Sequence, residues 1–73
     1  MNTQWLVYAL EVEKTASISQ AADRLFISQP SLSKAMRDLE HWLGFEVFER
    51  NARGVVPTAA GARFLEAARH ITA

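Results

Sequence analysis

Apolar residues near the N-terminus recur at helical spacing and predict a first helix over residues 3–14, capped by Asn2 or Thr3. At about 100° per residue, Trp5, Tyr8 and their apolar neighbours cover more than half of the helix circumference. An ordinary surface helix has a single apolar stripe. This wider arc must be covered on both sides, by a long neighbouring helix or by a partner chain.

Two further helices are predicted in quick succession. Ser17 followed by Gln20 has the spacing of a capping box and predicts a helix over residues 18–25. The next helix, over residues 30–43, begins with a proline, which the first turn tolerates, and stops before a glycine. Two helices joined by so short a turn are typical of a helix-turn-helix, here over residues 18–37.

The periodicity then changes from helical to strand-like. Residues 45–50 and 55–57 are short stretches rich in aromatic and β-branched side chains, and they flank a polar, glycine-bearing segment at residues 51–54. This pattern predicts a β-hairpin, so a wing is expected over about residues 45–57. A helix-turn-helix followed at once by a hairpin is a far more specific signal than either alone.

The chain ends in a predicted helix, residues 59–73, whose apolar stripe is open to two interpretations, ordinary core or dimer interface. We favour a dimer interface, because so small a domain buries little surface by itself. The expected dimer contacts are Trp5, Tyr8, Phe64, Leu65, Ala68 and Ile71. The fold class is therefore mainly α: a winged helix-turn-helix over residues 1–58, with a three-helix core and a β-hairpin wing, followed by a linker or dimerisation helix.

Composition excludes several function classes. The chain has 73 residues, of which 49% are hydrophobic, and contains no cysteine, which excludes a disulfide scaffold, thiol redox chemistry and thiolate zinc sites. His41 and His70 lie far apart without a ligand cluster, and Glu66 with His70 is interpreted as a surface pair. No glycine-rich phosphate loop and no nucleophile with a base is present, so we expect neither an enzyme nor a cofactor. The longest apolar run, residues 5–10, is too short to span a membrane, and we expect a cytoplasmic protein.

The formal net charge is zero, because eight Lys and Arg balance eight Asp and Glu, and this argues against nucleic-acid binding. The cations are nevertheless concentrated. Lys34 and Arg37 share the outer face of the third helix with Pro30 and Ser33, at positions i, i+3, i+4 and i+7. Arg50 and Arg53 flank the tip of the hairpin, where an arginine can enter a minor groove or bind a phosphate.

Simpler interpretations exist for these residues. Lys34 can pair with Asp38 on the same helix, and Arg50 with Glu46 or Glu49. Arg53 has no acidic neighbour at short range. The polar residues Gln29, Ser31 and Ser33 can serve as helix caps.

The chain resembles the N-terminal DNA-binding domain of LysR-type transcriptional regulators along essentially its whole length. The resemblance is carried by Ser19-Gln20-Ala21-Ala22, Ile27-Ser28-Gln29-Pro30-Ser31-Leu32-Ser33, Leu39-Glu40, Leu43-Gly44, Phe48-Glu49-Arg50, Arg53-Gly54-Val55, Thr58 and Ala60-Gly61. It implies Gln29, Pro30, Ser33 and Lys34 at bases or nearby phosphates, and Arg50 and Arg53 in the wing. The resemblance further implies that the last helix pairs antiparallel with its partner in a dimer.

Three positions depart from the family pattern, and one of them, Ile18 in place of the usual Phe, is interpreted as a change of core volume only. Lys34 stands where Arg is common, which removes the planar fork that binds guanine with two hydrogen bonds. Ala16 stands where Gly is frequent, so a left-handed backbone there is not assumed. Family members also carry a C-terminal effector-binding domain, none of which lies in this chain. A small-molecule inducer is expected only for that domain, and a tetramer only for a longer protein.

We therefore predict sequence-specific binding to double-stranded DNA for transcription regulation, by a two-fold dimer on an interrupted inverted repeat. The predicted DNA contacts are Gln29, Pro30, Ser31, Ser33, Lys34, Arg37, Arg50 and Arg53. One alternative is a winged-helix protein-interaction module that does not bind DNA. Another is a different winged-helix regulator family without the linker-helix dimer. DNA and a second copy of the chain are the expected partners, in the nucleoid-containing cytoplasm.

Overall fold

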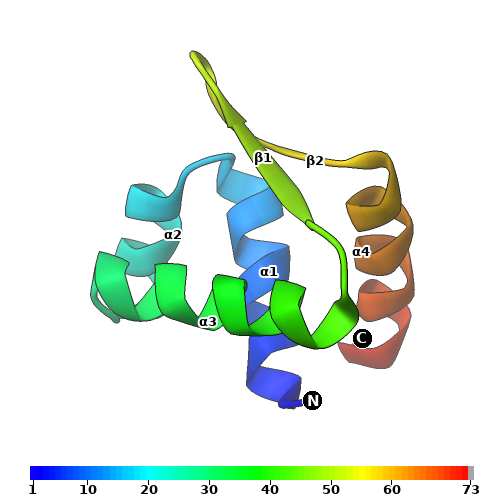
Figure 1. Cartoon of the computed structure of the whole chain (residues 1–73). Helices are drawn as coiled ribbons and strands as arrows, with labels where there is room; N and C mark the ends of the chain where they lie inside the picture. Colours follow the sequence, from blue (N-terminus) through cyan, green and yellow to red (C-terminus); the bar gives the residue numbers. More distant parts are fainter. Residues whose placement is uncertain (73) are drawn as a thin grey trace.

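The computed structural model describes residues 1–72 and confirms the mainly α fold with a hairpin (Figure 1). In chain order the elements are α1 (Thr3–Thr15), α2 (Ile18–Leu25), α3 (Gln29–Leu43), β1 (Phe48–Asn51), β2 (Gly54–Pro57) and α4 (Ala59–Thr72). Helix α1 lies in the middle, with α2 and α4 on opposite sides of it and α3 crossing it. The antiparallel hairpin projects from this body, with Phe48 paired to Pro57 and Asn51 to Gly54.

Short polar side chains start the first three helices. Asn2 rather than Thr3 caps α1, its Oδ1 accepting from the Gln4 N–H at 2.8 Å. Ser17 Oγ accepts from the Gln20 N–H at 3.1 Å, as the capping-box spacing predicts, and the predicted bounds of α2 are confirmed. Helix α3 starts at Gln29, one residue earlier than predicted. The remaining bounds either agree with the prediction or differ by one to three residues, which is ordinary for helix ends and short strands.

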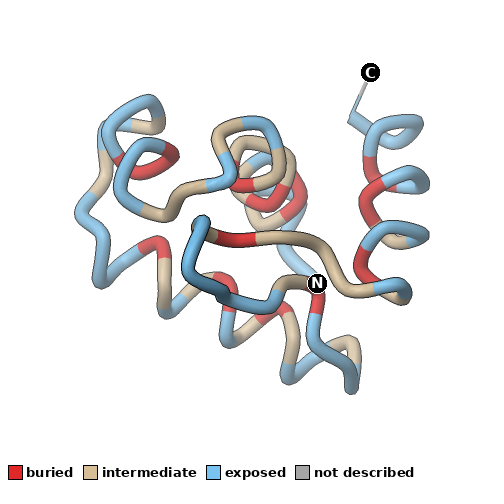
Figure 2. Tube along the Cα trace, turned by 90° about the horizontal axis from the view of Figure 1, so that it is seen from above, coloured by how far each residue is buried: buried red, intermediate tan, exposed pale blue. Residues whose placement is uncertain are grey.

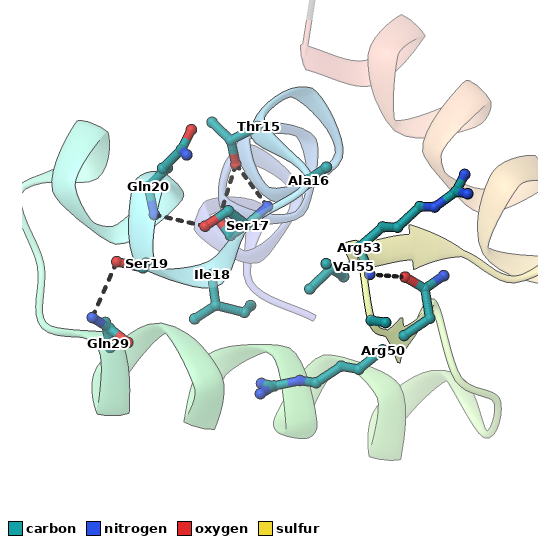
Figure 3. A pocket seen from close by; sticks show the side chains of 13 residues that line it. Thr15, Ala16, Ser17, Ile18, Ser19, Gln20, Gln29, Arg50, Arg53 and Val55 are labelled. Carbon is teal, nitrogen blue, oxygen red and sulfur yellow. Dashed lines mark hydrogen bonds between the residues drawn. The ribbon is translucent and has the colours of Figure 1, made fainter.

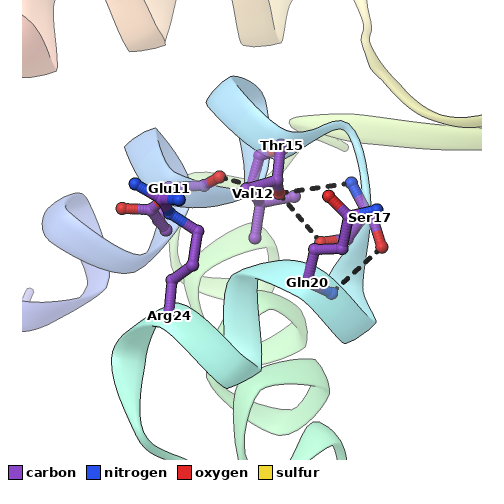
Figure 4. Close-up of polar contacts among 6 residues, drawn as sticks. All are labelled: Glu11, Val12, Thr15, Ser17, Gln20 and Arg24. Atoms are coloured by element: carbon purple, nitrogen blue, oxygen red, sulfur yellow. Dashed lines mark hydrogen bonds and ion pairs between the residues drawn. The ribbon is translucent and has the colours of Figure 1, made fainter.

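The turn between α1 and α2 is held by local polar contacts (Figure 4). The Thr15 hydroxyl lies 3.0 Å from the carbonyl oxygens of both Glu11 and Ser17. The Arg24 guanidinium pairs with the Glu11 carboxylate at 2.9 Å and so ties the end of α2 to α1. Ala16, with φ 55°, does adopt the left-handed conformation that its side chain gave no reason to assume.

The core is formed by the inner faces of all four helices and the start of the hairpin (Figure 2). Its largest fully buried side chains are Leu6, Val12, Leu32, Leu39, Val47 and Leu65. Leu65 and Ala68 are 0% and 1% exposed, so these two predicted dimer contacts pack inside the protein and leave no surface for a second chain. Trp5, Tyr8 and Phe64 are half-buried against the core, whereas Ile71 is 64% exposed.

Four hydrogen bonds from backbone N–H groups fix the wing and its flanking residues to the helices. The Glu40 carboxylate accepts from the N–H groups of Val47 and Phe48, at 2.7 and 3.1 Å. At the other end of the wing, the Val55 N–H donates to the Ala16 carbonyl oxygen at 3.1 Å. The Val47 carbonyl oxygen accepts from the Thr58 N–H at 2.9 Å, which sets where α4 begins. The hairpin is thus held at its base from α3 and near its tip from the α1–α2 turn.

Candidate nucleic-acid interface

The outer face of α3 is exposed along its N-terminal half. Pro30, Lys34 and Arg37 are exposed, and Ser33 is half-buried beside them. No carboxylate occupies the first two turns of this face, and α3 has no acidic residue in its first turn. The helix therefore presents hydroxyls and cations to the solvent, the groups that read base edges and bind phosphates.

Two grooves run between the wing and the helix-turn-helix. The larger, about 600 Å³, lies between the wing tip and the first turns of α2 and α3, and Gln29, Arg50 and Arg53 are among its lining residues (Figure 3). The smaller, about 240 Å³, lies between the wing and the outer face of α3, where Ser33, Arg37 and Arg50 line it. Arg50 borders both grooves and extends from the wing toward α3.

A side-chain hydrogen bond stabilises the turn at the wing tip. Asn51 Oδ1 accepts from the Arg53 N–H at 2.8 Å, a local bond that favours a tight turn. Arg53 is exposed, and its guanidinium points away from that of Arg50 (Figure 3). The two arginines therefore cover different parts of the wing surface rather than one spot.

The structure places the eight predicted contacts on one helix and the adjoining wing. Gln29, Ser33, Arg37, Arg50 and Arg53 line the grooves. The remaining three, Pro30, Ser31 and Lys34, lie exposed on α3 outside the groove linings. Ser19 also lines the larger groove but was not among the predicted contacts, although it belongs to the Ser19-Gln20-Ala21-Ala22 motif.

The N-terminal cap of α3 is Ser28, not one of the three residues considered for that role. Ser28 Oγ accepts from the Ser31 N–H at 3.2 Å and lies 2.8 Å from Ser31 Oγ. Ser31 is thus part of the cap through its own backbone and hydroxyl. Gln29 makes a different contact, donating from Nε2 to Ser19 Oγ at 3.2 Å.

The cations of α3 and the wing differ in whether they form ion pairs. Within residues 1–72, Lys34 pairs with Asp38 at 2.8 Å as the i, i+4 spacing predicts, but Arg37, Arg50 and Arg53 form no ion pair within 4.0 Å. Arg50 therefore does not pair with Glu46 or Glu49.

Several acidic groups are neutralised on other elements. Arg69 on α4 pairs with Glu13 and Glu66, each at 2.6 Å, and His70 lies 3.6 Å from Glu66. The hydrogen bond and charge of Arg69 hold the pKa of the Glu66 carboxyl below its ordinary value. These pairs leave the unpaired arginines of α3 and the wing as the exposed positive charge facing the two grooves.

Other kinds of site are not supported in the described part of the chain. Residues 1–72 contain no group of three or more His, Cys, Asp or Glu side chains placed to hold a metal ion. None of the helices there has the length and apolar character needed to cross a bilayer.

The helix-turn-helix with its attached β-hairpin places the chain in the winged helix-turn-helix class. Residues 3–62 match the family described as bacterial regulatory helix-turn-helix protein, lysR family. The chain therefore belongs to the lysR family, whose curated relatives are transcriptional regulators rather than enzymes.

Curated relatives match along nearly all of the chain. It is 42% identical over its full length to the HTH-type transcriptional regulator TfdT of Cupriavidus pinatubonensis, and 45% identical over 97% of its length to ClcR of Pseudomonas putida. The chain spans only 32% and 24% of the lengths of these two proteins.

Solved structures show the same fold. The DNA complex of the CbnR DNA-binding domain has a TM-score of 0.94 at 42% identity, over 99% of this chain and 83% of that one. The complex of the BenM DNA-binding domain with catB site 1 DNA has a TM-score of 0.94 at 36% identity, over 99% of this chain and 77% of that one. CbnR, a LysR family transcriptional regulator, matches with a TM-score of 0.95, and the chain covers 25% of that structure's chain.

Proposed function

We propose that this chain binds double-stranded DNA at specific sequences and thereby serves transcription regulation. The observation that carries the proposal is the position of three unpaired arginines, Arg37, Arg50 and Arg53, around grooves that Gln29 and Ser33 also line. The similar CbnR and BenM domains, whose solved structures are DNA complexes, support it.

In the proposed complex the N-terminal half of α3 enters the major groove. Gln29 and Ser33 face base edges there, and an amide can bind adenine by accepting from N6 and donating to N7. Pro30, Ser31, Lys34 and Arg37 lie against bases or the nearby backbone. The wing places Arg50 and Arg53 on the adjacent minor groove or on phosphates.

We further propose that the protein binds as a two-fold dimer. A few phosphate contacts give modest, salt-sensitive affinity, so two linked copies are needed for tight binding. With Leu65 and Ala68 in the core, the proposed interface consists of the exposed Ile71 and the half-buried Trp5, Tyr8 and Phe64. Two-fold symmetry implies an inverted repeat with half-sites one helical turn, about 34–36 Å, or a multiple of it apart.

In a longer protein, assembly into a tetramer and control by a small-molecule inducer would reside in a further domain. We also propose that the protein acts in the nucleoid-containing cytoplasm, where its DNA partner would lie.

Fluorescence anisotropy tests the proposal. The chain is titrated into a labelled duplex carrying an A·T-rich interrupted inverted repeat and into a scrambled duplex of equal composition. Tighter binding to the repeat is expected. Equal binding to both duplexes would contradict sequence-specific binding at that repeat, and no binding at low salt by a folded dimer would contradict DNA binding altogether.

A further inference from the structure

The amide of Gln29 is held by a side chain from the preceding helix. Its Nε2 donates to Ser19 Oγ at 3.2 Å, across the turn between α2 and α3 (Figure 3). Both residues are exposed and both line the larger groove. Ser19 thus contacts a side chain at the start of α3 rather than the backbone of its own helix.

Ser19 is not needed to start α2. Ser17 is the cap, its Oγ accepting from the Gln20 N–H at 3.1 Å. Ser19 lies in the first turn of α2 with an exposed side chain, so it contributes nothing to the buried core. Its hydroxyl is therefore free to act on Gln29 without a competing structural task.

The bond restricts a side chain that is otherwise flexible. A glutamine has three side-chain torsions, and ordering them on binding reduces affinity. It also reduces the difference in affinity between matching and mismatched base pairs. One Nε2 hydrogen is used by Ser19, which leaves the second hydrogen and Oε1 for a partner in the groove. An amide fixed in this way presents a donor and an acceptor in one orientation.

We propose that Ser19 is a positioning residue that orients the Gln29 amide and so sets the base preference at the base pair that Gln29 contacts. The inference rests on the proposed function, because it concerns how the DNA surface discriminates sequences. Ser19 is assigned no base contact of its own.

Selection from a random duplex library tests the proposal. The whole chain and the variants Ser19→Ala, Gln29→Ala and the double variant each select bound duplexes, and sequencing gives the base preference at every position. Ser19→Ala should reduce preference about threefold to tenfold at the positions that Gln29→Ala affects, and at no others. The double variant should lose no more than Gln29→Ala alone, since both changes remove one interaction.

Two further variants separate positioning from other roles. Ser19→Thr keeps a hydroxyl and should retain the wild-type preference. Gln20→Ala removes a neighbouring exposed side chain that lines the same groove, and should leave the preference at the Gln29 positions unchanged.

Three results would overturn the inference. Ser19→Ala could weaken all duplexes equally, which would make Ser19 a phosphate contact without sequence information. It could leave the preference unchanged, or its effect could add in full to that of Gln29→Ala. If the wild-type chain enriched no sequence at all, the proposed function itself would fail, an outcome distinct from these three.

Discussion

The Val55 N–H donates to the carbonyl oxygen of Ala16 at 3.1 Å, which joins the wing directly to the turn between α1 and α2. Ala16 adopts its left-handed backbone, φ 55°, at this same contact. The wing therefore does not swing freely beside α3. Its cations are held at a fixed position relative to the helix-turn-helix, as simultaneous contact with one duplex requires.

This junction has no room for a side chain at Gly54. A Cβ there would lie 2.5 Å from the Ala16 carbonyl oxygen, and the backbone has φ 128°. Gly54→Ala should lower the free energy of unfolding by at least about 1 kcal/mol more than Gly44→Ala. Gly44 is the matched control, with φ 84° but nothing within 4 Å of its Cβ position, so it bears only the backbone cost, about 1–2 kcal/mol. Equal losses in urea denaturation would contradict the close packing of the junction.

The base of the wing depends on Glu40. Glu40→Gln removes the charge from two hydrogen bonds, to the N–H groups of Val47 and Phe48, and should cost about 1–2 kcal/mol of stability. Hydrogen exchange at these two amides should accelerate as well. Glu49→Gln, on the exposed side of β1, is the control and should stay within about 0.5 kcal/mol of wild type. Unchanged exchange in Glu40→Gln would show that the carboxylate does not hold the wing.

The sequence predicted the helices well because helix starts depend on contacts between residues that are close in sequence. The Ser17 and Gln20 spacing placed α2 between its observed bounds, since the capping bond spans only three residues. In the sequence, Glu40 was noted only as part of the Leu39-Glu40 motif that carries the family resemblance. Its actual role depends on the chain reversing at Gly44 and returning Val47 to it, which a helical periodicity cannot reveal.

Periodicity likewise identified the apolar face of α4 but not what covers it. Leu65 and Ala68 were assigned to a partner chain, whereas the protein's own core covers them. The left-handed backbone of Ala16 was also unpredictable from its side chain, because a tertiary contact with Val55 accompanies it. On the candidate interface, the outer face of α3 followed from spacing, but the Ser19–Gln29 contact required the two helices to be placed in space.

Removing the acidic partner of Lys34 should strengthen DNA binding. The Asp38 carboxylate lies 2.8 Å from the Lys34 ammonium group, so a DNA phosphate must compete with Asp38 for this cation. Asp38→Asn should raise affinity about twofold to fivefold at low salt, with less gain at high salt. Stability should change by no more than about 0.5 kcal/mol, since the pair is exposed. Asp23→Asn, on the exposed surface of α2, serves as the control; an equal gain there would indicate a general charge effect only.

The proposed dimer interface is tested at Ile71. Ile71→Asp should weaken dimerisation about tenfold or more, because an apolar contact is replaced by a desolvated charge. The side chain is 64% exposed in the single chain, so the fold should be retained. Trp42, 57% exposed on α3 and outside the proposed interface, provides the control variant Trp42→Ser. Sedimentation equilibrium that finds Ile71→Asp as dimeric as wild type would remove Ile71 from the interface.

The most direct test of the central claim is the salt dependence of DNA binding for wild type, Arg53→Ala and Arg63→Ala. Arg63 is an exposed arginine on α4 that lines neither groove, and so matches Arg53 in charge but not in position. Anisotropy titrations over a range of salt concentrations should give Arg53→Ala a slope of log affinity against log salt that is shallower by about one, with Arg63→Ala unchanged. Identical slopes for all three proteins would contradict a DNA surface built from α3 and the wing.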